Sequence, residues 1–113
     1  MTTKKLKTND SSTTTVKAED LTKKILAKIT FGSFVRGIRE SDEITQTELA
    51  RRLGTSRQYI NAIETERQEV SIETAAKIGL ALGYGAESFL EVLIRTQLAK
   101  AGLKLQVQLK KAI

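Results

Sequence analysis

Four polar residues, Ser56, Arg57, Gln58 and Asn61, lie close together in a segment whose apolar residues recur at helical spacing. On a helix that begins at Thr55 or Ser56, these side chains would lie near the N-terminus and on the outer side. Arginine commonly pairs with guanine, and asparagine or glutamine with adenine, at base edges in the DNA major groove. We therefore expect this helix to enter the major groove and to read bases there.

A second helix must precede this one and hold it in place. Residues 46–64 read as two short helices joined by a tight turn at Gly54, where a positive φ is easily adopted by glycine. Ala50 is small, at the position where the second helix crosses the first. This pattern predicts a helix-turn-helix motif. Its apolar core positions are Leu49, Leu53, Ile60 and Ile63.

The composition excludes several classes of functional site. The chain has 113 residues and contains neither cysteine nor histidine. Disulfides, zinc sites and a Ser-His-Asp triad are therefore excluded, and the remaining residues offer no catalytic constellation. We predict a single-domain protein that is not an enzyme and binds no metal or cofactor.

The charge is positive and is concentrated at the two ends of the chain. The net charge is +6, of which residues 1–30 contribute +4, and residues 95–113 contain five basic residues and no acidic one. This distribution suits a polyanion partner, although a lysine-rich soluble surface would have the same charge. No apolar run approaches the roughly 20 residues that span a membrane, and residues 1–10 lack the apolar core of a secretory signal. We therefore expect a cytoplasmic protein without membrane contact.

Capping residues predict where the helices before and within the motif begin. Asp20 can cap a short helix, and Thr30 precedes a helix over residues 31–41. Thr45 and Glu48 have the spacing of a capping box, which predicts the start of the first motif helix at residue 46.

The chain divides into three predicted parts. Residues 1–19 are rich in threonine, serine and lysine and can bury little apolar surface, so we predict a basic disordered arm. Residues 20–102 form the helical domain, with the motif at positions 45–64. In this domain Ser71 caps a helix after the motif, and a last helix covers residues 86–101.

The last segment, residues 103–113, has a different period from the rest. Its apolar and polar residues alternate, as in a half-buried strand. No other segment of the sequence reads as a strand, so the ladder groups of this one would remain unpaired within the chain. We predict that it pairs with the same strand of a second copy, which makes the protein a homodimer. The predicted dimerisation residues are Leu103, Leu105, Val107 and Leu109.

With these helices in place, the chain resembles the XRE family of lambda-repressor-like helix-turn-helix proteins over roughly residues 30–83. The resemblance implies an all-α domain of five helices that binds an operator in double-stranded DNA. It also implies an ion pair between Arg39 and Glu64, which would tie the first helix to the end of the recognition helix. It assigns bases to Arg57, Gln58 and Asn61, and phosphates to Gln46 and Arg67.

The sequence leaves two interpretations open for several residues near the recognition helix. Thr55 and Ser56 can cap the helix, contact a phosphate, or do both. Gln58 can fold back toward Thr55 in a capping box instead of reaching a base. Tyr59 can stack on the first motif helix or contact DNA. Glu66 stands where many relatives have glycine, which places a negative charge near the expected DNA backbone.

Beyond residue 83, the last helix and the strand resemble the antitoxins of Hig-type and Hip-type toxin–antitoxin operons. This resemblance implies a dimeric repressor on a palindromic operator, encoded by a bacterium or phage, that also neutralises a cognate toxin protein. The alternatives are a stand-alone repressor of the phage or plasmid type and a helical adaptor that binds protein. The basic arm is then a solubilising tail, a minor-groove contact or a segment that wraps a toxin.

Overall fold

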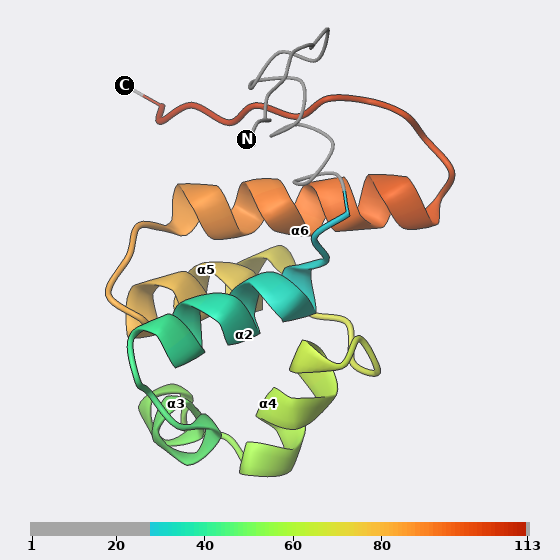
Figure 1. Cartoon of the computed structure of the whole chain (residues 1–113). Coiled ribbons are helices and arrows are strands. Elements are labelled where there is room, and N and C mark those ends of the chain that lie inside the picture. The colour runs from blue at the N-terminus through green and yellow to red at the C-terminus, as the bar shows by residue number, and fades with distance from the viewer. Residues whose placement is uncertain (1–27, 113) are drawn as a thin grey trace, which may run out of the picture.

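The computed structural model describes residues 28–112, and this part of the chain is all-α (Figure 1). Between these residues five helices follow one another without an intervening strand. The predicted all-α class and helix number are thus confirmed for the described range. The helices are α2 (Phe31–Ser41), α3 (Gln46–Leu53), α4 (Arg57–Glu64), α5 (Ile72–Ala81) and α6 (Ala86–Lys100).

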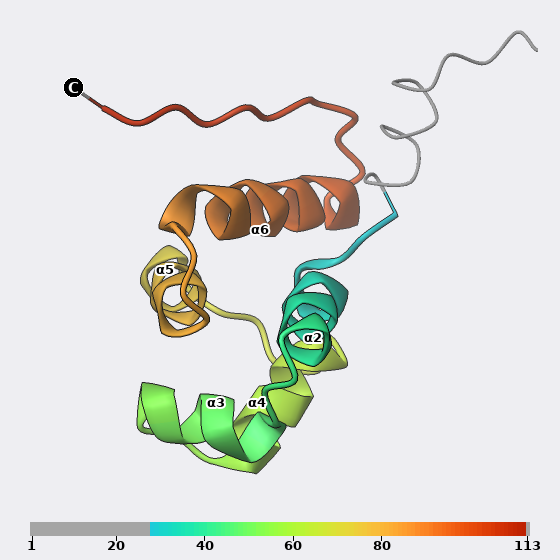
Figure 2. The same cartoon turned by 60° about the vertical axis from the view of Figure 1, so that its left-hand side comes forward.

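The helix-turn-helix pair, α3 and α4, lies at one end of the molecule, and α6 lies at the other (Figures 1 and 2). Between them are α2 and α5. The long helix α6 packs mainly against α5, and α2 contacts both α4 and α6. The motif is therefore held by a scaffold of three helices, which leaves the outer sides of α3 and α4 uncovered within the described range.

Side-chain caps begin four of the described helices. Thr30, Thr45, Ser56 and Ser71 each accept a hydrogen bond from the backbone amide three residues later. Such caps satisfy one of the amides that the first helical turn leaves without an intrahelical partner. The predicted helix starts after Thr30, Thr45 and Ser71 are confirmed.

Only one half of the predicted capping box at Thr45 is formed, the hydrogen bond from the Glu48 amide to the Thr45 side chain. The Glu48 carboxylate accepts hydrogen bonds from Arg51 at 3.0 Å and from Arg52 at 2.9 Å, and not from the backbone of Thr45. The hydrogen bond from Arg51, and to a smaller extent that from Arg52, lowers the pKa of Glu48 to about 2. Arg52 also donates to the Ala81 carbonyl at 2.8 Å, so it links α3 to the C-terminus of α5. Ion pairing therefore replaces the second half of the box.

The turn between α3 and α4 has the predicted geometry. Gly54 adopts φ 68°, in the left-handed region that favours glycine. The Thr55 amide then donates to the Ala50 carbonyl at 2.9 Å and closes the end of α3. Because the chain is in extended geometry at Ser56, α4 begins at Arg57 and crosses α3.

The hydrophobic core lies between the helices and receives residues from every one of them. The Phe34 and Phe89 rings meet edge to face, with centroids 4.9 Å apart. All four apolar positions predicted for the motif lie in this core or pack against it. The largest side chains with almost no exposed surface are Phe89, Leu49, Ile60, Ile63, Ile78 and Val35.

The predictions for the two chain ends have different outcomes. The arm over residues 1–19, and residues 20–27 of the short helix predicted after Asp20, lie outside the described residues. Residues 103–112 form no strand, since no extended segment lies beside them in the described part of the chain. They run back along the outer side of α6 instead (Figures 1 and 2). The described part of the single chain thus contains no strand, and the predicted strand, which would pair with a second copy, stays a prediction.

From residue 28 to residue 112, no helix combines the length and hydropathy that a membrane span requires. Over the same range, no three histidine, cysteine, aspartate or glutamate side chains gather where they could hold a metal ion.

The first turn of α2 packs closely on two other parts of the fold. The Phe31 amide donates to Thr96 of α6 at 2.8 Å, and the Gly32 amide donates to the Glu66 carboxylate at 2.5 Å. A Cβ on Gly32 would collide with the backbone oxygens of Ile63 and Glu64 at the end of α4. The absence of a side chain at Gly32 therefore allows α2 to approach α4.

Replacing Gly32 by alanine should destabilise the protein by about 1–3 kcal/mol, because the backbone of α4 would have to move. The matched control is Gly37→Ala in the same helix, where a Cβ meets no atom within 4 Å. That change should stabilise the helix by about 0.5–1 kcal/mol. Urea denaturation followed by circular dichroism measures both changes, and equal effects would contradict the close approach of α2 and α4.

Candidate nucleic-acid interface

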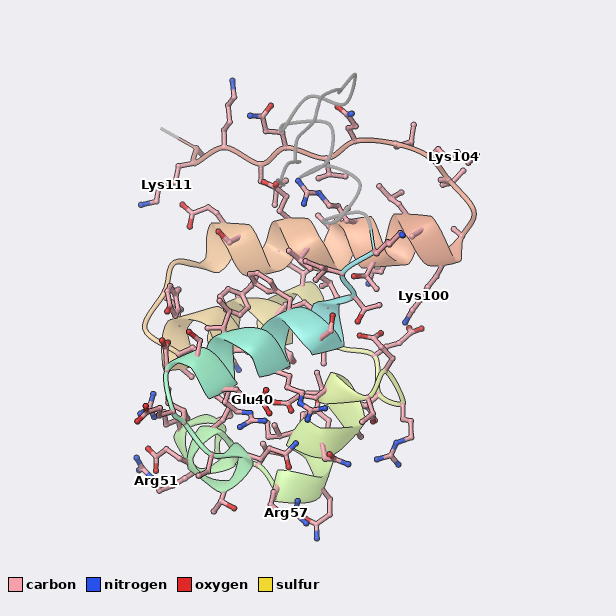
Figure 3. All side chains as sticks on the ribbon, in the orientation of Figure 1. Glu40, Arg51, Arg57, Lys100, Lys104 and Lys111 are labelled. Atoms are coloured by element: carbon pink, nitrogen blue, oxygen red, sulfur yellow. The ribbon has the colours of Figure 1, made fainter. Side chains whose placement is uncertain are left out.

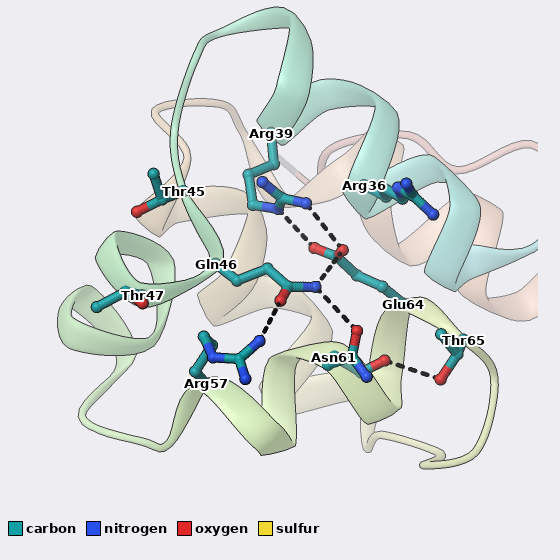
Figure 4. Close-up of a pocket in the computed structure, with 9 residues that line it drawn as sticks. All are labelled: Arg36, Arg39, Thr45, Gln46, Thr47, Arg57, Asn61, Glu64 and Thr65. Carbon is teal, nitrogen blue, oxygen red and sulfur yellow. Dashed lines mark hydrogen bonds and ion pairs between the residues drawn. The ribbon is translucent and has the colours of Figure 1, made fainter.

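A polar hollow of about 470 Å³ opens between α2, α3 and α4 (Figure 4). It brings together residues that are far apart in the sequence, and three of them are arginines. Arg57, Asn61 and Gln46 lie together in it (Figure 4). The lining residues are Arg36, Arg39, Thr45, Gln46, Thr47, Arg57, Asn61, Glu64 and Thr65.

A buried ion pair between α2 and α4 lies at the base of this hollow. Arg39 donates through Nε and Nη2 to the two carboxylate oxygens of Glu64, at 2.7 and 3.0 Å. Its Nη1 donates to the Ile44 carbonyl at 2.7 Å. The two side chains are 9% and 1% exposed, and the bond to Glu64 raises the pKa of Arg39 above its ordinary value. Both charges are thus hydrogen-bonded, as buried ions must be.

Gln46 connects this ion pair to Arg57 and Asn61, which lie earlier on α4. Its amide nitrogen donates to Glu64 at 3.0 Å and to Asn61 at 3.2 Å. Its amide oxygen accepts a hydrogen bond from Arg57 Nη1 at 3.1 Å. One half-buried side chain at the start of α3 therefore contacts three residues of α4 and fixes how the two motif helices meet.

Arg57 and Asn61 lie one turn apart on α4 and face the hollow (Figure 4). Arg57 is exposed, and a guanidinium has five N–H donors, of which one is directed at Gln46. Asn61 is half-buried and accepts from Gln46 through Oδ1. The arrangement presents donors for base or phosphate oxygens without first breaking the buried ion pair.

The geometry at the start of α4 distinguishes between the capping alternatives. Ser56 Oγ accepts from the Tyr59 amide at 3.1 Å and is the cap, whereas Thr55 precedes it and is half-buried. The alternative capping box of Thr55 and Gln58 is therefore not formed, and Gln58 is exposed on α4. Tyr59 is half-buried and packs against the core, which agrees with stacking inside the motif.

Glu66 corrects an expectation, because its side chain turns toward α2 and α6. It has φ 60°, a left-handed conformation that suits the glycine of many relatives. Its carboxylate accepts from the Gly32 amide at 2.5 Å and from Lys100 Nζ at 2.9 Å. Burial alone would raise the pKa of Glu66, but Lys100 and the Gly32 amide together outweigh it and lower that pKa. The charge is thus neutralised within the fold.

The neighbouring Arg67 is exposed at the end of α4. Its amide donates to the Ala62 carbonyl at 2.8 Å, and its Nε donates to Thr65 Oγ1 at 3.0 Å. These two bonds fix the backbone of Arg67 and the Nε edge of its guanidinium, while the residue as a whole remains exposed. The predicted phosphate contact of Arg67 is compatible with this position and stays a prediction.

Three residues of the hollow had no role predicted from the sequence, and a fourth, Thr45, was predicted only as a helix cap. Arg36 lies one turn before Arg39 on α2, Thr47 follows Gln46 at the start of α3, and Thr65 is the C-cap of α4. The spacing of Arg36 and Arg39 on one helix is the signal by which Arg36 could have been found. Thr47 and Thr65 carry no comparable sequence signal, since each enters the hollow through the meeting of separate helices.

Replacing Arg39 by alanine should cost about 3–5 kcal/mol, because Glu64 would remain as a buried charge without its partner. Arg36→Ala is the matched control on the same helix. Arg36 pairs with Glu40 at 3.1 Å, but these side chains are 59% and 55% exposed, so the loss should stay within about 0.5 kcal/mol. Chemical denaturation of the two variants tests this, and similar losses would contradict the role of the buried pair.

Replacing Glu66 by glutamine should lower the stability at neutral pH, because its charge-assisted hydrogen bonds weaken. We expect a loss of only about 1 kcal/mol, because Lys100 is partly exposed and solvent screens its charge. The pKa of Glu66 in the folded protein lies below its unfolded value of about 4.3. The carboxylate therefore stabilises the fold above that pH, and the contribution disappears as the pH falls through the folded pKa.

The stability difference between the wild type and Glu66→Gln should accordingly shrink as the pH falls from neutral through the unfolded pKa and then the lower folded pKa of Glu66. Urea midpoints measured across this range provide the test. Glu69→Gln, an exposed change in the same loop, is the control and should leave the stability unaltered. A difference for Glu66→Gln that did not depend on pH would rule out the electrostatic origin.

Comparisons with known proteins agree with this geometry. Residues 35–89 match the family model described as helix-turn-helix. An immunity repressor protein of Bacillus phage phi105 is 31% identical over 78 residues, which cover 67% of this chain and 54% of that protein. The chain thus spans about half the length of the curated relative that it matches. No solved structure matches the chain.

The matched range begins in α2 and ends in α6, so it contains both motif helices and the whole hollow. Neither match supports the predicted antitoxin subclass. Together, the fold and the family match identify residues 35–89 as a helix-turn-helix domain, a kind of domain that binds DNA.

Proposed function

We propose that this chain is a sequence-specific transcriptional repressor of the phage-immunity type, which acts as a dimer on a two-fold operator. The observation that carries the proposal is the hydrogen-bonded set of Arg57, Gln46 and Asn61 above the buried ion pair. Side chains held in place before the ligand arrives lose less conformational entropy on binding. This preorganisation supports a role in reading DNA.

The base-reading residues in this proposal are Arg57, Gln58 and Asn61. All three lie in the first five positions of α4, the part of a recognition helix that enters the major groove. Arg57 suits a guanine through its bidentate guanidinium, and the amides of Gln58 and Asn61 suit adenine. The Gln46 contact restricts the directions in which Arg57 can point, which favours one base position over its neighbours.

Contacts to phosphate would set the position of α4 on the duplex. Gln46 at the start of α3 and Ser56 at the start of α4 lie where the free amides of the two helices face outward. We assign phosphate contacts to both, to Thr55 beside them and to Arg67 at the far end of α4. Tyr59 packs against the core, so a contact with DNA would involve its outer edge.

A repressor of this kind binds DNA with two recognition helices. On a two-fold operator, the α4 helices of two copies would lie in successive major grooves about 34 Å apart. The net charge of +6 supports the affinity for the polyanion. We assign the dimer contact to the tail after α6, through Leu103, Leu105, Val107 and Leu109.

The phage-type repressor is preferred to the antitoxin for one reason. The curated relative is named as an immunity repressor, and the match spans 67% of this chain. No comparison supplies a similar argument for a toxin partner. The proposed function therefore needs DNA and a second copy of the chain, and no further protein.

Selection of bound sites from a random DNA pool tests the proposal. The wild type should recover an inverted repeat with half-sites about one helical turn apart. Arg57→Ala should cost about 1–3 kcal/mol and relax the preference at one position of each half-site. Arg51→Ala is the charge-matched control, because Arg51 is exposed on α3 and lies outside the hollow. It should preserve the selected sequence.

Two results would count against the proposal. Recovery of no common sequence by the wild type would exclude a sequence-specific repressor. A uniform loss of affinity on all sequences for Arg57→Ala would show that Arg57 contacts phosphate and reads no base.

A further inference from the structure

The tail after α6 is turned back by a tight reversal. Gly102 adopts φ 76°, and the Leu103 amide donates to the Leu98 carbonyl at 2.9 Å. Residues 103–112 then run in extended form along the side of α6 that faces away from α2 and α5 (Figures 1 and 2). The tail is therefore placed on the surface as one extended segment.

The burial of the tail residues partly follows the alternation of apolar and polar residues in the tail sequence. Val107 and Leu109 are half-buried, whereas the residues between and beside them are exposed. Leu103 and Leu105, which belong to the same apolar set, are 50% and 63% exposed. One face of the tail is thus apolar from Leu103 to Leu109, but the single chain covers only the second half of this stretch.

The outer face of α6 makes polar contacts with the second half of the tail. Glu91 accepts a hydrogen bond from the Leu109 amide at 3.2 Å, and Glu87 lies 3.9 Å from Lys111. The tail itself contains three lysines and no acidic residue. The hydrogen bond to Glu91, which also pairs with Arg95, and the contact of Lys111 with Glu87 place this half of the tail on its own α6.

Within residues 28–112, the backbone of the tail has hydrogen-bonding groups without a partner. Among the described residues, its backbone hydrogen bonds are those donated by Leu103 and Leu109. An extended segment with free amides and carbonyls is a template for pairing with another strand. Within the described range, the tail thus combines an unpaired extended edge with two exposed leucines.

We infer that this edge pairs with the same segment of a second copy, in an antiparallel register centred on Gln106. The inference rests on the proposed function in so far as that function requires a dimer. A two-fold axis through the pair makes the interface self-complementary, as closed dimers require. Each tail stays on its own α6, and the partner tail covers its exposed leucines.

The register follows from which residues would face each other. Centred on Gln106, Leu103 opposes Leu109 and Leu105 opposes Val107, so every apolar residue of the set meets another. Lys104 then opposes Gln108, and no lysine opposes a lysine.

The neighbouring registers are less favourable. Centred on Val107, the pair would place Lys104 opposite Lys110 and Leu103 opposite Lys111. Centred on Leu105, it would leave Leu109 without an apolar partner from this set.

The position of the tail is compatible with binding DNA at the same time. Figure 3 shows Lys104 and Lys111 on the tail at one end of the molecule, and Arg57 at the other. The paired tails would therefore leave the hollow open in both copies.

Single cysteine variants of the full chain test the register, because the chain has no cysteine of its own. In the proposed pair, Gln106→Cys opposes its own copy, at a distance that a disulfide can bridge. Gln108→Cys is the matched control on the same face of the tail. Its two copies would lie roughly 14 Å apart, too far for a disulfide.

After mild oxidation, Gln106→Cys should migrate on a non-reducing gel at twice the 12.5 kDa mass of the chain, and a reductant should reverse this. Gln108→Cys should remain at the single mass. Equal crosslinking of both variants, or crosslinking of neither, would overturn the inference. Site selection with the wild type reports on the proposed function separately, since an inverted repeat can still be recovered when neither variant crosslinks.

Discussion

The ion pair between Arg39 and Glu64 is the contact on which the rest of the helix-turn-helix depends. It joins α2 to the last residue of α4, and Gln46 extends it to the first residue of α3. Three helices thus meet at one polar point inside an otherwise apolar fold. Because a buried charge is tolerated when it is paired and hydrogen-bonded, the relative positions of these helices are closely restricted. The hollow above the pair has a fixed base for the same reason.

Features determined by nearby residues could be predicted from the sequence. The caps at Thr30, Thr45 and Ser71 and the left-handed turn at Gly54 each depend on a few consecutive residues, and all four are present. The helical spacing of the motif also indicated which of its side chains are buried. The exact start of α4 was open between two residues, because Thr55 and Ser56 are both good caps.

Features determined by distant residues could not be derived in this way. Glu66 binds Gly32 and Lys100, each 34 positions away, so its sequence neighbours gave no sign that it turns inward. The hydrogen bonds of Gln46 with α4 depend likewise on how two helices cross. In the tail, alternation predicted one apolar face, but a period of two does not specify what lies against that face. Its position on α6 depends on Glu91, which belongs to another element.

The eight residues of α4 include a buried group and an exposed group, which have different roles. Ile60, Ile63 and Glu64 are buried and hold the helix in the fold, whereas Arg57 and Gln58 are exposed. Substitutions at the exposed positions therefore leave the core unchanged and cost little stability. In the proposed function, single mutations at these positions would change the target sequence while each variant stays folded. Divergence of binding preference is then limited by selection on the target and not by the tolerance of the fold.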